Sequence, residues 1–250
     1  MSTPSWLVAK PIAHRGLHNK ANGVIENTLS AAEAGVERGF PIELDVQLTA
    51  DHEAVVFHDF ELERLTGETG RVAERNLSDL TGIDISGAKA GDKIPSLTQF
   101  LDTVAGRVPL VVEIKSKFDG NMTLTKRTVE ILNDYSGPFV IKSFDPQIVA
   151  TLRSIAPSIT RGIIGELEYA SKADSFMTDE LRHRLSNLLH FEESQPQFVS
   201  WKVNNLPCAA PYLAKAIGNL PLMAWTVRNP EDRARAEQHA DQMVFEGFLP

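Results

Sequence analysis

Short apolar segments of β-strand length alternate with helix-like segments along nearly the whole 250-residue chain. Because a parallel strand pair needs a long crossover, usually a helix, this alternation predicts a mainly parallel sheet. The chain shows no glycine-rich nucleotide-binding fingerprint, so a closed (β/α)8 TIM barrel is favoured over an open sheet. The eight predicted barrel strands are Pro11–His14, Ile42–Val46, Leu110–Lys115, Phe139–Ser143, Thr160–Ile164, Phe198–Val203, Leu222–Val227 and Gln242–Glu246.

Helix-start signals fall between these segments. Asn27 precedes the helical pattern of Thr28–Arg38 and is interpreted primarily as its N-cap. Ser96 with Gln99 has the spacing of a capping box. Two further starts combine an N-cap residue with proline at the first helical position, at Asp145-Pro146 and Asn229-Pro230.

One connection departs from the alternation. Ile42–Val46 is followed by a second apolar segment, Ala54–His58, with no room for a crossover helix. The two segments are therefore predicted to form an antiparallel hairpin. With Asp51-His52 as a two-residue turn, counting inward places Asp45 opposite His58, and a slip of one residue would turn His58 to the other face.

The polar segment 59–93 follows the hairpin and is too long for an ordinary loop. It is predicted to form a small insertion over the mouth of the barrel. The rest of the chain shows no linker, so residues 1–250 are expected to form a single catalytic domain.

Charge and composition restrict the partners. A net charge of −8 argues against nucleic acid as the main partner, because phosphate backbones require a dense Lys/Arg surface. Cys208 is the only cysteine, so no intramolecular disulfide can form. The sequence contains neither a secretory signal pattern nor an apolar run of membrane-spanning length. We therefore expect a cytoplasmic protein that does not insert into membranes.

Charged residues gather at the carboxyl ends of the first three barrel strands, where barrel enzymes place their active sites. Glu43 and Asp45 are two residues apart on one strand, and Glu113 lies in the next. Three carboxylates at one mouth repel each other unless a cation lies among them, and oxygen ligands favour Mg²⁺ or Ca²⁺. Internal ion pairs, such as Glu113 with Arg15 or Lys115 with Asp45, are the alternative explanation.

An ordered set of motifs resembles the glycerophosphodiester phosphodiesterase family, a phospholipase-C-like phosphodiesterase barrel. The resemblance covers essentially the whole chain. The matching motifs are Ile12-Ala13-His14-Arg15-Gly16, Glu26-Asn27-Thr28, Glu43-Leu44-Asp45-Val46, His58-Asp59, Ile94-Pro95-Ser96-Leu97, Glu113-Ile114-Lys115, Ser143-Phe144 and Ala224-Trp225-Thr226-Val227.

The resemblance implies metal-dependent hydrolysis of a glycerophosphodiester to sn-glycerol 3-phosphate and an alcohol, a reaction of lipid and glycerol metabolism. It implies one divalent cation, Mg²⁺ or Ca²⁺, and two histidines that act as general acid and base. Which histidine performs which step stays open. The implied roles are acid–base catalysis by His14 and His58, metal binding by Glu43, Asp45 and Glu113, and phosphate binding by Arg15 and Lys115.

Trp225 is a candidate substrate contact, with simple packing at the barrel mouth as the alternative. Two other functions are alternatives to glycerophosphodiester hydrolysis. A lysophospholipase D-type or other lipid phosphodiesterase would favour an exposed apolar rim, whereas 59–93 is largely polar. A catalytically silent phosphodiester-binding protein would not require a pair of histidines for proton transfer.

Overall fold

The computed structural model describes residues 3–169 and 176–250. Short 3-10 segments occur at Ser5–Val8, Lys20–Asn22, Val72–Glu74 and Val203–Asn205. The β-strands are β1 (Ile12–Ala13), β2 (Ile42–Leu48), β3 (Ala54–Val56), β4 (Leu110–Ile114), β5 (Phe139–Ser143), β6 (Arg161–Gly165), β7 (Phe198–Lys202), β8 (Leu222–Val227) and β9 (Gln242–Phe245). The α-helices are α1 (Leu29–Glu37), α2 (Leu77–Leu80), α3 (Leu97–Val104), α4 (Thr123–Asn133), α5 (Pro146–Ile155), α6 (Asp179–Ser186), α7 (Phe191–Ser194), α8 (Ala209–Ala216) and α9 (Pro230–His239).

The sheet confirms the predicted fold class. Its hydrogen-bonded order is β1-β9-β8-β7-β6-β5-β4-β2-β3, and β1 also pairs with β2. Among the described residues, eight parallel strands with helices between them thus form a TIM barrel, to which β3 is added as an antiparallel strand. Each predicted strand coincides with an observed one to within two residues at either end.

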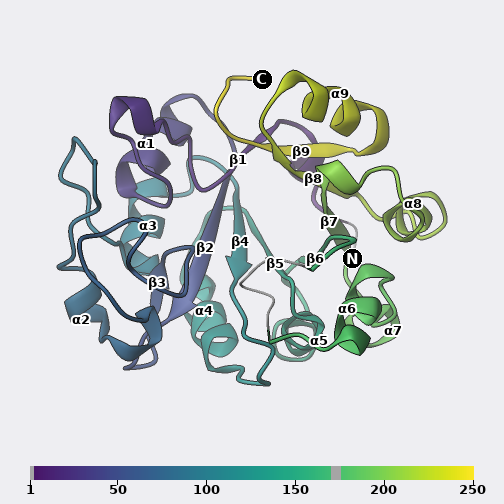
Figure 1. Ribbon diagram of the computed structural model, residues 1–250, viewed down its shortest axis with the longest axis horizontal. Coiled ribbons are helices and arrows are strands. Elements are labelled where there is room, and N and C mark those ends of the chain that lie inside the picture. Colours follow the sequence, from purple (N-terminus) through teal and green to yellow (C-terminus); the bar gives the residue numbers. More distant parts are fainter. Residues whose placement is uncertain (1–2, 170–175) are drawn as a thin grey trace. The chain divides into compact units, whose positions relative to one another are not determined.

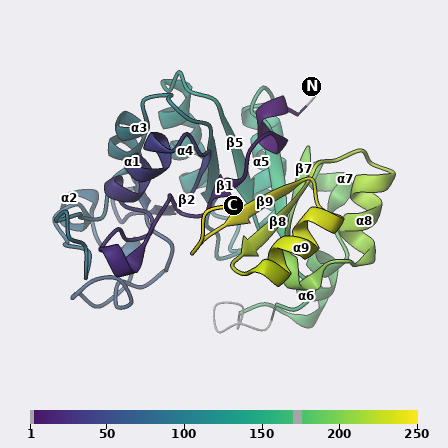
Figure 2. The same cartoon turned by 90° about the horizontal axis from the view of Figure 1, so that it is seen from above.

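The chain divides into two compact units. The N-terminal unit spans Ile12–Ile141, and the C-terminal unit contains Lys142–Phe248 with the first segment of the chain up to Pro11. In the N-terminal unit, α1 packs against α3, and both lie to one side of strands β2 and β4 (Figures 1 and 2). The single-domain organisation expected for residues 1–250 stays a prediction.

The β2–β3 hairpin forms as predicted, but the predicted register is wrong by one residue. The Phe57 amide donates to the Asp45 carbonyl at 3.1 Å, so Phe57 and not His58 lies opposite Asp45. The turn contains three residues rather than two, since the Thr49 amide donates to the Glu53 carbonyl. Its last residue, His52, has a φ of 64°, as three-residue hairpin loops require.

The N-cap prediction for α1 is also wrong by one position. Thr28 is the cap: its backbone is extended, and its side chain accepts a hydrogen bond from the Ala31 amide. Asn27 instead has a φ of 58°, which lies outside the extended region that an N-cap residue occupies. The starts predicted at Ser96, Asp145 and Asn229 are confirmed as side-chain caps.

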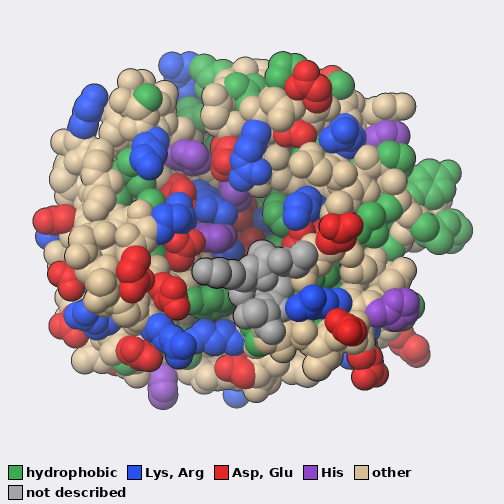
Figure 3. Space-filling model, viewed as in Figure 1, with side chains coloured by type: hydrophobic (Ala, Val, Ile, Leu, Met, Phe, Trp, Pro, Cys, Tyr) green, Lys and Arg blue, Asp and Glu red, His purple; other side chains and the backbone are tan. Residues whose placement is uncertain are grey.

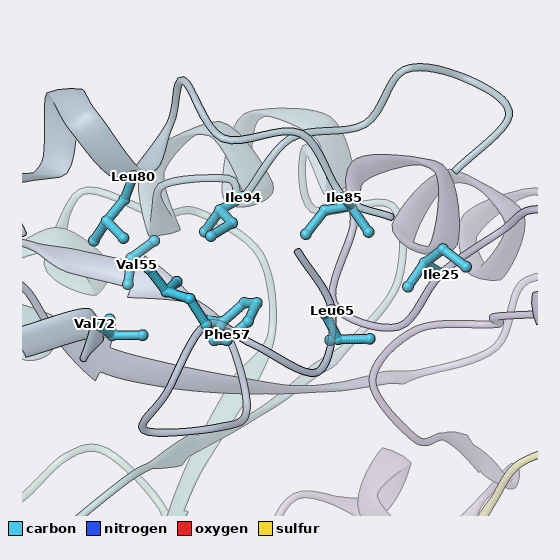
Figure 4. Close-up of a cluster of buried hydrophobic side chains, with 9 residues drawn as sticks. Ile25, Val55, Phe57, Leu65, Val72, Leu80, Ile85 and Ile94 are labelled. Carbon is cyan, nitrogen blue, oxygen red and sulfur yellow. The ribbon is translucent and has the colours of Figure 1, made fainter. Parts of the chain in front are cut away.

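The insertion 59–93 has a hydrophobic cluster of its own. Residues from this segment pack against Val55 and Phe57 of the hairpin and against Ile25 (Figure 4). This packing holds the backbone of a segment whose regular structure consists of one 3-10 turn, one α-helical turn (α2) and isolated β-bridges. The members from the insertion and its end are Leu62, Leu65, Val72, Leu80, Ile85 and Ile94.

No helix in the described part of the chain has both the length and the apolar character needed to cross a membrane.

Candidate active site

Three neighbouring parallel strands of the N-terminal unit carry the predicted metal and phosphate ligands. Ala13 of β1 pairs with Ile42 of β2, so His14 and Arg15 follow β1 beside the β2 strand. In the β2–β4 ladder, Asp45 lies directly opposite Glu113. Glu43 lies two residues before Asp45 and so on the same face of β2. Strand register alone therefore brings the three carboxylates together.

These carboxylates form a buried cluster. Glu43, Asp45 and Glu113 each offer an oxygen within 4.8 Å of the others, and each residue is 5% exposed or less. Acidic residues at such burial require positive charge nearby. The three residues are thus a candidate cation site made of oxygen ligands, as the sequence predicted.

Lys115 lies against this cluster. Its ammonium contacts Asp45 Oδ1 at 2.8 Å and Glu113 Oε1 at 2.5 Å. Burial alone would raise the pKa of Asp45, but the charges of Lys115, His58 and Arg15 outweigh it and hold that pKa well below its usual range. Burial would likewise lower the pKa of Lys115, and the carboxylates of Asp45 and Glu113 raise it. The ion pair between Lys115 and Asp45, considered from the sequence as an alternative, is therefore present.

Arg15 connects the cluster to a neighbouring acid. Its Nε lies 3.4 Å from Asp45 Oδ2, and its Nη1 donates to Glu26 Oε1 at 2.6 Å. Its backbone amide donates to Glu43 Oε2 at 3.1 Å, and its φ of 55° is left-handed. Burial alone would lower the pKa of this guanidinium, whereas the charges of Asp45, Glu26 and Glu43 raise it. Arg15 thus stays a cation at the edge of the carboxylate cluster.

Asn27, which the sequence analysis interprets primarily as a helix N-cap, is a residue of the site. Its side-chain amide donates to Asp45 Oδ2 at 2.8 Å, and its side-chain oxygen accepts from the Asp45 amide at 3.3 Å. Asn27 is buried; its bond to Oδ2 orients the Asp45 carboxylate, and its bond from the Asp45 backbone amide holds the Asn27 side chain in place. The signal was available in the sequence, because an Asn-Thr pair before a helix needs only one of its members as the cap.

The two predicted catalytic histidines lie in different surroundings. His14 is buried, with Nε2 3.9 Å from Glu43 Oε2. The His58 side chain is 30% exposed, and its Nδ1 lies 2.6 Å from Asp59 Oδ1. His58 lies just beyond the end of β3 and directly follows Phe57, whose amide donates to the Asp45 carbonyl at 3.1 Å. Both histidines therefore border the carboxylate cluster, one against Glu43 and the other near Asp45.

Asp59 and Glu26 are joined by a residue of the insertion, Arg64. Its guanidinium donates to both oxygens of Asp59 and to both oxygens of Glu26. Burial alone would raise the pKa of Glu26, but the hydrogen bonds and charges of Arg64 and Arg15 lower it to about 2. The sequence interpretation did not anticipate Arg64, since nothing in the pattern of 59–93 indicates a partner 38 residues away.

Figure 3 shows side chains of Lys or Arg, of Asp or Glu, and of His close together in the area where Figure 1 draws β2 and β4. Side chains of both charge signs are therefore present on this surface of the molecule.

Trp225 belongs to the C-terminal unit. Its indole N–H donates to the Ser200 carbonyl at 3.2 Å, and its ring packs edge-on against Phe144, with centroids 5.5 Å apart. Phe144 makes a second edge-on contact with Tyr169. These contacts account for Trp225 as a packing residue, and its contact with substrate stays a prediction.

A TIM barrel that carries histidines, cations and a carboxylate cluster at the ends of its first strands is the arrangement of a barrel phosphodiesterase, a hydrolase. The model of the glycerophosphoryl diester phosphodiesterase family matches residues 14–245. The chain therefore belongs to this family.

Individual relatives agree with the family match. A glycerophosphodiester phosphodiesterase of Caldanaerobacter subterraneus subsp. tengcongensis is 32% identical over 161 residues, which cover 61% of this chain and 65% of that protein. YhdW of Bacillus subtilis is 27% identical over 227 residues, covering 84% and 92% of the two chains.

Solved structures show the same fold. An Oleispira antarctica phosphodiesterase, in complex with the product sn-glycerol-3-phosphate, has a TM-score of 0.74 at 20% identity, covering 95% of this chain and 92% of that chain. A glycerophosphodiester phosphodiesterase of Parabacteroides distasonis has a TM-score of 0.73 at 19% identity, with the same two coverages.

Proposed function

We propose that the protein hydrolyses glycerophosphodiesters to sn-glycerol 3-phosphate and an alcohol, with His14 and His58 as the general acid and base. The observation that carries this proposal is the placement of both histidines next to one buried carboxylate cluster, His14 beside Glu43 and His58 after the residue that pairs with Asp45. Family membership supports the substrate class, as does the product bound in the Oleispira antarctica relative.

The contact with Asp59 determines which nitrogen of His58 exchanges protons. Asp59 stays ionised, since the hydrogen bonds and charges of His58 and Arg64 outweigh the effect of burial and lower its pKa. An ionised carboxylate only accepts hydrogen bonds, so His58 Nδ1 carries the hydrogen. Nε2 is then the nitrogen that takes up or releases a proton during the reaction.

A phosphodiester is cleaved when one oxygen attacks phosphorus and the alcohol oxygen leaves. In the proposed sequence one histidine removes the proton of the substrate's own glycerol hydroxyl, and the other protonates the departing alcohol. The product of this step is a cyclic phosphate. Water then opens the ring, and the two histidines return to their starting protonation states.

Glu43, Asp45 and Glu113 fit a divalent cation. All three are buried, and each offers a carboxylate oxygen within 4.8 Å of the others. A hard cation with oxygen ligands, Mg²⁺ or Ca²⁺, suits this donor set. When bound, such an ion polarises the attacking hydroxyl and offsets the charge of the phosphate.

Arg15 and Lys115 are proposed to bind the phosphate oxygens. Both are cations at the edge of the carboxylate cluster, with side chains 16% and 13% exposed. A guanidinium and an ammonium at this position stabilise the negative charge that spreads over the phosphate oxygens in the transition state.

The test is release of sn-glycerol 3-phosphate from glycerophosphocholine, with and without EDTA, by the wild type and by His14→Ala. We expect EDTA to abolish release, and His14→Ala to lower it by about 100-fold or more. His183→Ala, a change at an exposed position of helix α6, is the matched control and should behave as wild type. Folded, metal-loaded protein that releases no product from a panel of glycerophosphodiesters would contradict the proposed function.

A further inference from the structure

Arg64 uses two edges of its guanidinium on two different carboxylates. The Nε and Nη2 edge donates to Asp59, with Nη2 at 3.0 Å from Oδ1. The Nη1 and Nη2 edge donates to Glu26 at 3.0 and 2.8 Å. Four N–H groups of one planar group are therefore engaged, although the Arg64 side chain is 45% exposed. Such use of an exposed arginine is unusual for a surface ion pair, which seldom fixes geometry.

Both ends of this arrangement are rigid. Leu62 and Leu65, on either side of Arg64, are buried in the hydrophobic cluster of the insertion, and Figure 4 labels Leu65. On the other side, Glu26 Oε1 also accepts from Arg15 Nη1 at 2.6 Å, and the preceding Ile25 belongs to the same cluster. Arg64 is thus held by its own backbone and by a carboxylate that is itself held.

Asp59 lies between Arg64 and His58. Its Oδ1 accepts from His58 Nδ1 and from Arg64 Nη2, while its Oδ2 accepts from Arg64 Nε. A carboxylate with a side chain 24% exposed can rotate when a single imidazole is its only partner. The two bonds from Arg64 fix the plane of the carboxylate, and that plane fixes the direction in which Oδ1 meets the imidazole.

We propose that Arg64 is a positioning residue for the reaction: it holds Asp59, and through Asp59 it holds His58 with Nδ1 protonated and Nε2 available for proton transfer. This inference rests on the proposed role of His58 as a proton-transfer residue. It gives the insertion 59–93 a function in catalysis, because its packed backbone supplies the residue that orients the histidine.

Lysine cannot replace arginine in this role. The ammonium group offers three donors around one nitrogen, whereas Arg64 spans two carboxylates with donors in a fixed plane. Arg64→Lys keeps the positive charge and loses the planar fork. This substitution therefore separates positioning from a purely electrostatic effect of the charge.

The experiment compares Arg64→Met and Arg64→Lys with the wild type, using metal-loaded protein and glycerophosphocholine. Both variants are expected to lose about tenfold in kcat, with KM changed by less than about twofold. Arg71→Met is the matched control, since Arg71 is an exposed arginine of the same insertion that pairs with one carboxylate, Glu74. It should keep the wild-type kcat, and thermal unfolding should show that all variants are folded.

A second measurement reports on His58 itself. In protein with ¹⁵N-labelled histidine, the ring nitrogen shifts of His58, assigned with His58→Gln, should show hydrogen on Nδ1. Arg64→Met and Arg64→Lys should both shift the tautomer population toward Nε2. A general loosening of the insertion would lower thermal stability without this selective change.

The outcomes distinguish a failure of the positioning role of Arg64 from a failure of the acid–base role of His58. The positioning role would be overturned if Arg64→Lys had the wild-type kcat. It would also be overturned if Arg64→Met left both kcat and the His58 tautomer unchanged while His58→Ala was inactive. If His58→Ala kept full activity, the proposed acid–base role of His58 would fail, and the role of Arg64 would fail with it.

Discussion

Two regions of the site hold their charged groups in different ways. The carboxylate cluster of Glu43, Asp45 and Glu113 is placed by strand register and is 5% exposed or less. The chain formed by His58, Asp59, Arg64 and Glu26, here called the histidine chain, comes from loops and the insertion. Its side chains are 15–45% exposed. Hydrogen bonds between neighbouring strands thus position the first region, whereas side-chain contacts and the packed backbone of the insertion position the second.

Because the two regions differ in burial, removing a charged group from each should cost a different amount of folding free energy. Removing one partner of a buried ion pair costs about 3–5 kcal/mol, because the remaining charge is left without compensation. Removing one member of a part-exposed pair costs about 1 kcal/mol or less, because water solvates the remaining partner. Substitutions in the cluster should therefore lower both stability and activity, and substitutions in the histidine chain should lower activity with a smaller loss of stability.

The largest effect is expected for Asp45→Asn. This change removes the charge that Lys115, Arg15 and the candidate cation share. Activity should fall at least about a thousandfold, equivalent to ~4 kcal/mol of transition-state stabilisation. The free energy of unfolding, measured with urea, should also fall by about 3 kcal/mol. Asp102→Asn, on the exposed side of α3, is the control. An Asp45→Asn protein with wild-type stability would contradict the expected difference in stability between the cluster and the histidine chain.

His58→Ala tests the other region. We expect kcat to fall about 100-fold or more, the usual contribution of a general acid or base. The free energy of unfolding in urea should change by less than about 1 kcal/mol, because the side chain is part-exposed and its hydrogen bond with Asp59 is accessible to solvent. A loss of stability as large as that of Asp45→Asn would show that the histidine chain is as structural as the cluster.

Asp59→Asn should have a smaller effect than the loss of His58. The amide keeps the shape of the side chain but can present N–H to His58 Nδ1, which favours the wrong tautomer, and kcat should fall about tenfold to a hundredfold. Asp84→Asn is the control, since Asp84 is an exposed acid of the same insertion, paired with Lys93. In the double variant Asp59→Asn with Arg64→Met, the two losses in kcat should not add, because both substitutions act through the Asp59 carboxylate.

The strands and the carboxylate cluster could be predicted from the sequence because both depend on local patterns. Apolar runs of five or six residues mark the strands, and acidic residues two apart within such runs mark one face. Glu43, Asp45 and Glu113 were predicted as a set for this reason, and the structure brings them within 4.8 Å.

The two wrong predictions, the hairpin register and the N-cap of α1, concern positions where two alternative local structures both suit the sequence. The Asp51-His52 pair suits a two-residue turn, but the left-handed His52 closes a three-residue loop instead and shifts the register by one. Asn27 and Thr28 are both good N-caps, and the left-handed backbone of Asn27 leaves the cap to Thr28. Arg64 could not be predicted, because its partner Glu26 is distant in sequence and segment 59–93 has no periodic pattern.

The smallest expected effect concerns acid stability, measured as the difference in free energy of unfolding between the wild type and Glu26→Gln. Folding lowers the pKa of Glu26 from 4.5 to about 2, so the ionised carboxylate stabilises the folded protein fully above pH 4.5 and loses this effect as the pH falls toward 2. The full shift corresponds to about 3 kcal/mol, and solvent around the half-exposed Arg64 reduces it to about 1–2 kcal/mol.

Urea unfolding at a series of pH values between about 6 and 3 measures this difference. The wild type should be the more stable protein at the upper end, and the two stabilities should approach each other on acidification, because protonated Glu26 resembles glutamine. The difference in free energy of unfolding between the wild type and Asp45→Asn should persist to lower pH, since the pKa of the buried Asp45 lies well below its usual range. A Glu26→Gln difference that did not change with pH would mean that Arg64 and Arg15 do not stabilise the ionised carboxylate. The histidine chain would then lack the anchor that distinguishes it from an ordinary surface ion pair.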